Sequence, residues 1–255
     1  MARNSVASTS RRSVRAYDNV ERVRRYDRDM DLLHPNRHRM IGVAMEILAE
    51  FEGRPSVALE LGTGTGFFAL RFLQRHREAT LVGVDGAASM IELASARLQD
   101  AGVGDRARLV QSSFEDLDLS EAKIGPVDVV FSSYALHHLH AEAKRAVLTR
   151  AVSLLKPGGW FLNADLVSNP DLAVEAVIQR IRVDGIVARN LAQAEPDPRF
   201  VEGDQVRDFI DALEQNEGDC PLPVGEDLAL LRDSGIAGAA VFWQEYREIV
   251  LGGQS

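Results

Sequence analysis

Glycine recurs at every second position in the segment Glu60–Gly66, whose sequence is ELGTGTG. An apolar run, Val57–Leu61, leads into this segment, and an amphipathic pattern, Phe67–Arg75, follows it. Glycines at such a strand-to-helix turn permit positive φ angles and let a ligand approach the backbone closely. The free N–H groups at the start of the following helix favour a carboxylate. The segment therefore predicts a cofactor site at the carboxyl end of a strand.

The spacing of these glycines separates two classes of cofactor. Dinucleotide sites have the pattern G-x-G-x-x-G, whereas this segment is G-x-G-x-G with an acid, Glu60, two residues before the first glycine. A second carboxylate, Asp85, ends the apolar run Thr80–Val84 and comes 19 residues after Gly66. This combination resembles the class I S-adenosylmethionine-dependent methyltransferases of the small-molecule branch, over about Pro35–Leu251.

The resemblance implies S-adenosylmethionine as the cofactor and assigns contacts to it along the chain. Asp85 stands where the family accepts both ribose hydroxyls, and Met90 where a methionine flanks adenine. Ser113 replaces the family's usual aspartate for the adenine amino group, and Phe114 offers its N–H to the ring. Arg37, on an N-terminal helix, is expected to pair with the methionyl carboxylate. The implied cofactor-binding residues are Glu60, Gly62, Thr63, Gly64, Gly66, Asp85, Gly86, Met90, Ser113, Phe114, Ser133 and Arg37.

Three histidines are candidate catalytic residues, because a general base assists transfer to a phenol, alcohol or amine. His137 and His138 follow the run Val127–Ser132 in a stretch that resembles the family's D-x-V…L-H-H-L, and His34 lies beside Pro35. Two interpretations stay open for each histidine: a base, or a side chain that packs or shapes the pocket. A base is optional, since transfer from a sulfonium is an in-line displacement that alignment and desolvation also promote.

Three tyrosines and one arginine are the expected substrate-binding residues. Tyr17 and Tyr26 are predicted parts of a lid, with packing against the sheet as the alternative, and Tyr134 directly follows the fourth strand. Arg207 falls near the arginine with which carboxy-S-adenosylmethionine synthase binds its carboxylated cofactor. The glycine segment of this chain has the ordinary methyltransferase form and not that enzyme's G-C-S-x-G.

The elements that position these residues are short β-rich runs alternating with amphipathic helices, which is typical of a parallel sheet covered on both faces. Strands are predicted at Val57–Leu61, Thr80–Val84, Ala107–Gln111, Val127–Ser132, Trp160–Leu166, Ala240–Trp243 and Tyr246–Leu251. Helices are predicted at Val14–Met30, Asn36–Phe51, Phe67–Arg75, Ser89–Ala101, Ala141–Leu155 and Val224–Ser234, and over Asp171–Gln215 with a turn at Glu195–Pro198. The predicted fold is a doubly wound, mostly parallel, seven-stranded Rossmann-like α/β sheet with N-terminal helices and a helical insertion before the last two strands.

We expect one S-adenosylmethionine-binding domain over residues 1–255. Its predicted parts are a flexible tail and lid helix (1–34), a cofactor-binding core (55–168), a helical cap (170–223), and a closing helix and strand pair (224–251). The turn Pro157–Gly159 is assigned a structural role between helix and strand.

Composition argues against several classes of protein. A net charge of −9 argues against nucleic acid as a partner, and no apolar run is long enough for a membrane span. The single cysteine, Cys220, fits a reducing cytoplasm, and no Cys or His spacing resembles a metal site, so no metal is expected. A homodimer is a further expectation.

The predicted function is methyl transfer from S-adenosylmethionine to a small organic acceptor, such as a secondary metabolite, at O, N or C. Three alternatives stay open. The protein binds the same cofactor for a cyclisation, a rearrangement or carboxy-S-adenosylmethionine formation, or it is a non-catalytic partner, or it is a nicotinamide dehydrogenase, which the glycine spacing disfavours.

Overall fold

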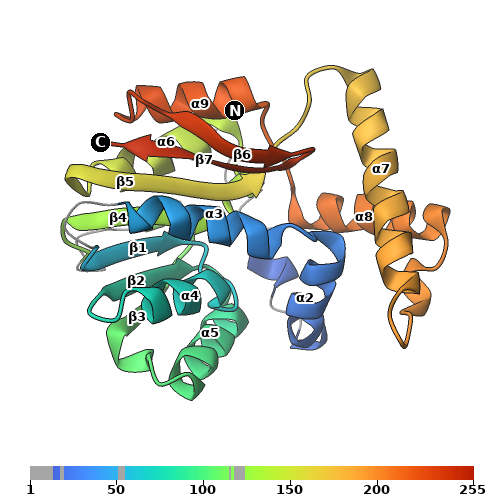
Figure 1. Ribbon diagram of the computed structural model, residues 1–255, viewed down its shortest axis with the longest axis horizontal. Coiled ribbons are helices and arrows are strands. Elements are labelled where there is room, and N and C mark those ends of the chain that lie inside the picture. Colours follow the sequence, from blue (N-terminus) through green and yellow to red (C-terminus); the bar gives the residue numbers. More distant parts are fainter. Residues whose placement is uncertain (1–13, 18–19, 51–54, 115, 118–123) are drawn as a thin grey trace.

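The computed structural model describes residues 14–17, 20–50, 55–114, 116–117 and 124–255. Figure 1 shows one twisted sheet with helices on both faces, and a group of helices beyond one end of the sheet. The predicted tail of residues 1–13 lies outside the described residues. No helix in the described ranges combines the length and apolar composition that a bilayer crossing needs.

The sheet has seven strands in the order β3-β2-β1-β4-β5-β7-β6, which confirms the predicted fold class. The strands are β1 (Val57–Leu61), β2 (Thr80–Asp85), β3 (Ala107–Gln111), β4 (Val127–Ser133), β5 (Leu155–Leu166), β6 (Ala240–Glu245) and β7 (Glu248–Gln254). β1 to β5 pair in parallel, and β7 is antiparallel to both β5 and β6. The carboxyl ends of β1, β2 and β4 therefore meet at one edge, next to the point where the strand order reverses.

The helices are α2 (Val20–Leu33), α3 (Arg37–Ala49), α4 (Phe67–Arg75), α5 (Ala88–Asp100), α6 (Ala141–Val152), α7 (Leu172–Leu191), α8 (Gly203–Glu217) and α9 (Val224–Asp233). α3, α4 and α5 bury their apolar sides on one face of the sheet around Phe72 and Phe131. α6 and α9 cover the other face around Leu59 and Leu148. Because both faces are covered, β4 is buried almost throughout rather than on alternate residues.

Two predicted strand boundaries are wrong, and pairing explains both. β5 begins at Leu155 rather than Trp160, because Leu155 pairs with Val127 and the predicted Pro157–Gly159 turn becomes an irregularity within the strand. The last strand begins at Glu248 and continues to Gln254. Tyr246 lies in the turn with a φ of 52°, and Gly252 lets the strand pass so close to β5 that a Cβ would lie 2.0 Å from the Phe161 carbonyl oxygen.

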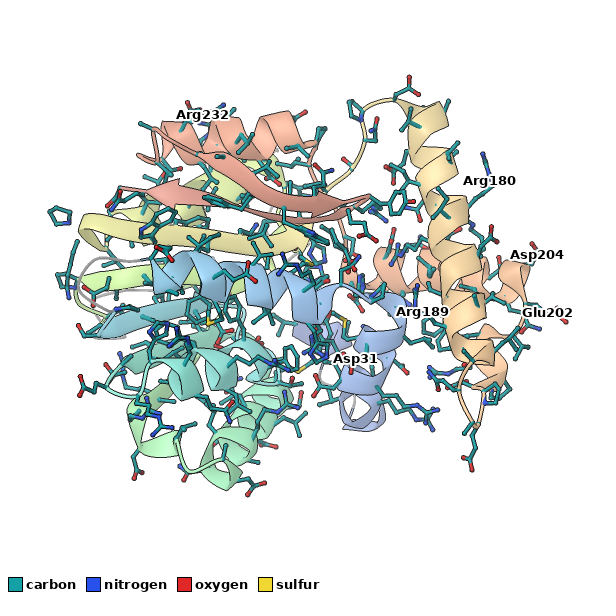
Figure 2. The ribbon with its side chains drawn as sticks, viewed as in Figure 1. Asp31, Arg180, Arg189, Glu202, Asp204 and Arg232 are labelled. Atoms are coloured by element: carbon teal, nitrogen blue, oxygen red, sulfur yellow. The ribbon has the colours of Figure 1, made fainter. Side chains whose placement is uncertain are left out.

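α7 and α8 form the predicted helical cap, and α2 joins them to the sheet (Figure 1). Leu32 and Leu33 of α2 pack with Val183, Ile186 and Phe200 in a cluster of the cap. Figure 2 shows Arg189 on the side of α7 that faces α2, where its guanidinium donates to the Leu32 carbonyl at 2.9 and 3.0 Å. The cap and α2 are thus fixed to each other over the carboxyl end of the sheet.

Candidate active site

The glycine segment forms the turn between β1 and α4, and each of its glycines has a positive φ. A Cβ at Gly62 would lie 2.2 Å from the Ala135 Cβ, so only glycine fits there. At Gly64 a Cβ would meet nothing within 4 Å, which means that open space borders this residue. The segment therefore offers bare backbone to a ligand at Gly64, while Gly62 allows the loop to pack against the end of β4.

Asp85, at the end of β2, is bonded to this loop. Its Oδ2 atom accepts the Gly64 N–H at 2.8 Å, and its Oδ1 atom accepts the Ala87 N–H at 2.9 Å. Burial raises the pKa of Asp85 above its ordinary value, although the backbone hydrogen bonds oppose this shift. A carboxylate thus stands beside the open side of the glycine loop, with lone pairs left for further donors.

A cavity of about 760 Å³ lies over this edge of the sheet and brings most of the predicted site together. The predicted residues on its wall are Tyr17, Tyr26, Arg37, Gly62, Thr63, Gly64, Asp85, Gly86, Met90, Ser113, Phe114, Ser133, Tyr134 and His138. They come from the loops after four strands and from the N-terminal helices. We name it the cofactor cavity.

Glu60 and Gly66 are not on this wall. Gly66 precedes α4 and approaches Ala94 of α5, where a Cβ would lie 3.1 Å from the Ala94 Cα. Glu60 is fully buried below the loop, and burial raises its pKa well above the usual range. Both residues therefore pack inside the protein and do not line the cavity.

Ser113 reaches the wall, but its hydroxyl is already engaged. Its Oγ donates to the Asp116 carboxylate at 2.7 Å and accepts the Asp116 N–H at 3.2 Å. Asp116 is not among the site residues predicted from the sequence. Its position three residues after a serine could have indicated this hydrogen-bonded turn. The Ser113 hydroxyl is therefore held by Asp116, which is itself not among the residues of the cavity wall.

Arg37 is 5% exposed and belongs to a buried charge network. It donates to Asp27 at 2.8 Å and stacks over the Phe67 ring, with 3.8 Å between the guanidinium carbon and the ring centre. Asp27 also accepts from Thr65 of the glycine segment and from Arg97. The Nη1 atom of Arg37 has no hydrogen-bond partner among the described residues, and the carboxylate of Asp31 lies 3.7 Å from it.

A second cavity, of about 1300 Å³, lies between α2, the cap and the ends of β4 and β5. Tyr17, Tyr26, Met30 and Tyr134 line both cavities. The charged side chains on its wall are Arg22, Arg25, Arg182, Arg199, Asp29, Glu214, Glu217 and Asp219. We name it the acceptor cavity, and the four shared residues form the boundary between the two cavities.

The boundary tyrosines are held by carboxylates and by one another. The Tyr17 hydroxyl donates to Glu217 at 2.8 Å, and its ring meets Tyr26 edge-on with 5.7 Å between ring centres. Tyr134 has a φ of 47°, which is rare outside glycine, and its hydroxyl donates to Glu248 at 2.5 Å. Burial raises the pKa of Tyr26 to about 12, so this phenol stays neutral at physiological pH.

The predicted histidines fall into two groups. His34 stacks on Tyr134 with 4.8 Å between ring centres, and its Nδ1 lies 3.5 Å from Glu248. Burial lowers the pKa of His34. His137 and His138 form the short 3-10 helix η3 (Leu136–His138) after β4 and are both buried.

His137 and His138 meet two carboxylates that no sequence motif marks. Nδ1 of His137 lies 2.6 Å from Oδ1 of Asp165, and Nδ1 of His138 lies 2.8 Å from Oδ1 of Asp219. Burial opposes protonation of His137, but the charges of Asp165 and Asp219 outweigh it and raise its pKa. No local signal links these residues, since Asp165 is on β5 and Asp219 follows the cap.

Arg207, a predicted substrate-binding residue, lies on α8 and is not part of either cavity wall. The cavity-facing residues of α8 include Phe209 and Leu213. The α8 residues on the wall of the acceptor cavity begin at Phe209, so Arg207 precedes the part of the helix that lines it. Arg182 and Arg199 are the cap arginines on the wall of the acceptor cavity.

Comparison with known proteins agrees with this site. Residues 58–159 match a family model described as a methyltransferase domain. An uncharacterized methyltransferase of Geobacillus sp. (strain WCH70) is 30% identical over 130 residues, which are 51% of this chain and 56% of that protein. A ubiquinone/menaquinone biosynthesis C-methyltransferase of Brucella anthropi is 28% identical over 142 residues, 54% of this chain and 51% of that protein. The chain spans little more than half the length of these curated relatives.

Solved structures share the fold over more of the chain. A putative O-methyltransferase from Nostoc punctiforme covers 92% of this chain, with 59% of its own length, a TM-score of 0.63 and 17% identity. An O-methyltransferase family protein from Burkholderia thailandensis covers 84% of this chain, with 57% of its own length, a TM-score of 0.60 and 21% identity. The fold and the glycine-loop site define the class I S-adenosylmethionine-dependent methyltransferases. Over residues 58–159 this chain is similar to that class, and the solved structures share its fold.

Proposed function

We propose that this protein transfers a methyl group from S-adenosylmethionine to a small organic acceptor, such as a secondary metabolite, held under the helical cap. The observation that carries the proposal is the shared wall of the two cavities. Tyr17, Tyr26, Met30 and Tyr134 border both, so ligands in the two cavities would lie on either side of the same side chains. Such proximity of the two ligands favours the alignment that an in-line displacement requires.

The residues of the cofactor cavity fit S-adenosylmethionine. Asp85 offers a carboxylate to the ribose hydroxyls, and Nη1 of Arg37, which makes no hydrogen bond among the described residues, suits the methionyl carboxylate. Met90 and Phe114 supply apolar surface for adenine, and the open backbone at Gly64 leaves room for the ligand. When bound, this cofactor supplies an electrophilic methyl group on a sulfonium. The protein's part is to bind and align the ligand and to exclude water.

The acceptor cavity indicates a polar acceptor without a large net charge. Two of its cations are already paired within the protein: Arg182 bonds Glu214 at 2.5 Å, and Arg199 bonds Asp29 at 2.8 Å. A concave site lined by both apolar and charged side chains fits a small molecule better than a polymer. Where the acceptor is a hydroxyl or amine, His34 and His137 are the histidines on the wall of this cavity, and His34 already contacts Glu248 and Tyr134.

Calorimetric titration with S-adenosylmethionine, S-adenosylhomocysteine and NADH tests the cofactor. We expect micromolar binding of both sulfur compounds and none of NADH. Incubation with polar small acceptors then tests the reaction, and methyl transfer requires that S-adenosylhomocysteine accumulates. Conversion of an acceptor without S-adenosylhomocysteine would instead support a cyclisation or rearrangement, and NADH binding alone would overturn the cofactor assignment. A homodimer and a cytoplasmic location stay predictions of the sequence.

A further inference from the structure

Three side chains that commonly bind metal ions converge where the two cavities meet. His138 lines the cofactor cavity, and His137 and Asp219 line the acceptor cavity. Nδ1 of His138 and Nε2 of His137 lie 2.8 and 3.7 Å from Oδ1 of Asp219. One ligand atom from each of the three residues lies within 4.8 Å of the others. These separations are close to those between donors that share one ion at bonds of about 2.0–2.2 Å.

Two of these atoms are buried without a hydrogen bond. Nδ1 of His138 and Oδ1 of Asp219 have no partner in hydrogen-bond geometry among the described residues, although they lie 2.8 Å apart. Both side chains are only 8% exposed. A buried polar atom left unsatisfied costs about 1–3 kcal/mol. A cation between the two atoms would satisfy both at once.

The third ligand is oriented by an outer carboxylate. Asp165 is fixed by N–H donors from His137 and Leu166 and by the Asn163 amide, at 3.1, 2.9 and 3.2 Å. Its 2.6 Å contact with Nδ1 of His137 places the imidazole proton there. That tautomer leaves the Nε2 lone pair on the side of Asp219. Metal-binding histidines ordinarily have such a carboxylate behind them.

The protein also holds Asp219 against the histidines through its backbone. The N–H of Cys220, the next residue, donates to the carbonyl oxygen of His137 at 2.9 Å. The segment after α8 is thereby tied to η3, and the carboxylate is brought to both imidazoles. A backbone hydrogen bond therefore positions the residues of the cluster, in addition to the contacts between their side chains.

We propose that His137, His138 and Asp219 bind one divalent transition-metal ion between the cofactor and acceptor cavities. Two imidazoles and one carboxylate suit Zn²⁺, Mn²⁺, Fe²⁺, Co²⁺ or Ni²⁺, and three protein ligands leave coordination positions for an acceptor oxygen. An ion there lowers the pKa of a bound hydroxyl, whose proton is released to solvent. This catalytic role rests on the proposed methyl transfer, whereas the binding of the ion does not.

Titration of chelator-treated protein with Co²⁺, followed by visible absorption, tests the site. We expect ligand-field bands that saturate at one ion per chain. His138→Gln and Asp219→Asn should each weaken binding at least a hundredfold, and Asp165→Asn about ten- to a hundredfold, because it acts through His137. The matched control is His140→Gln, an exposed histidine two residues from His138. Cys220→Ser tests for a sulfur ligand, and both of these variants should keep the wild-type bands.

A measurement on the unaltered protein guards against variants that fail to fold. In ¹⁵N spectra of the imidazole rings, added Zn²⁺ should shift Nε2 of His137 and Nδ1 of His138 and leave His34 and His140 unchanged. Absence of saturable Co²⁺ binding, or bands that persist in both ligand variants, would overturn the proposal. Calorimetry with S-adenosylmethionine in the absence of metal tests the cofactor separately, so failure of one proposal is distinguishable from failure of the other.

Discussion

The Oδ2 atom of Asp85 accepts the backbone N–H of Gly64 at 2.8 Å, and this bond joins the end of β2 to the glycine loop after β1. The carboxylate that is predicted to hold the ribose also fixes the residue whose open side faces the cavity. Ligand binding and loop geometry are therefore coupled through one side chain.

Asp85→Asn should weaken S-adenosylmethionine binding by about ten- to a hundredfold. The change replaces a charged acceptor of two hydroxyl hydrogen bonds, together worth about 1.5–3 kcal/mol. Calorimetry measures the affinity, and Asp100→Asn, at the exposed end of α5, is the control. Equal affinity in Asp85→Asn and wild type would contradict the assigned role.

The affinity for the cofactor should also depend on pH through Asp85. Burial raises the pKa of this carboxyl, and the hydroxyl donors of a ribose prefer its ionised form. Affinity is thus retained above the raised pKa and lost as the pH falls below it. Calorimetry across acidic pH should show this decline in wild type and a flatter profile in Asp85→Asn.

Three glycine variants separate loop packing from ligand contact. Gly64→Ala and Gly102→Ala both place a side chain at positive φ with nothing within 4 Å, and each should cost about 1–2 kcal/mol of stability. Only Gly64→Ala should also reduce cofactor affinity, because Gly102 is remote from the cavity. Gly62→Ala should destabilise the fold more than either, since its Cβ would lie 2.2 Å from that of Ala135. Thermal melting and calorimetry together check the three outcomes, and a normal affinity of Gly64→Ala would argue against ligand contact at this residue.

Tyr17→Phe should loosen closure over the cofactor. The change removes the 2.8 Å hydrogen bond to Glu217, which ties the N-terminal segment to the end of α8. We expect S-adenosylhomocysteine to dissociate about three- to tenfold faster, which corresponds to about 0.7–1.4 kcal/mol. Stopped-flow displacement measures the rate. The control is Tyr246→Phe, which alters a tyrosine in the exposed turn before β7 and should leave the dissociation rate unchanged. An unchanged rate in Tyr17→Phe would show that Tyr17 is not part of a lid.

Asp128 should stabilise the fold in a pH-dependent way. Burial acts to raise its pKa, but hydrogen bonds from Lys156, Val57 and Ser56 outweigh it and lower the pKa to about 2. Its contribution to the free energy of unfolding is therefore complete at pH values above the unfolded-state pKa near 3.8, and this contribution is lost as the pH falls through about 2. Screening by solvent reduces it to about 1 kcal/mol. The free energies of unfolding of wild type and Asp128→Asn, measured with urea, should differ by this amount at pH 6 and converge near pH 2. Asp105→Asn is the exposed control. An equal difference at both pH values would contradict the argument.

Local sequence patterns were sufficient for the fold class and for the centre of the cofactor site. The glycine segment and Asp85 each follow an apolar strand, and such strands in a doubly wound sheet deliver their carboxyl ends to one edge. Residues defined by their distance from these strands, such as Gly62, Gly64 and Met90, could therefore be assigned from the chain alone. The local pattern missed the extent of some strands, because pairing determines it. β7, for example, continues through Gly252 because β5 continues beside it.

Packing between distant elements sets which charged groups meet the predicted residues. Asp165 and Asp219 are 28 and 81 positions from the histidines that they contact, and Cys and His spacing predicts no metal site. The resemblance places Arg207 at the substrate, yet this residue lines neither cavity. Helical and strand periodicity report which side of one element is apolar. The side chains that converge across distant elements depend on how those elements pack, which no local pattern encodes.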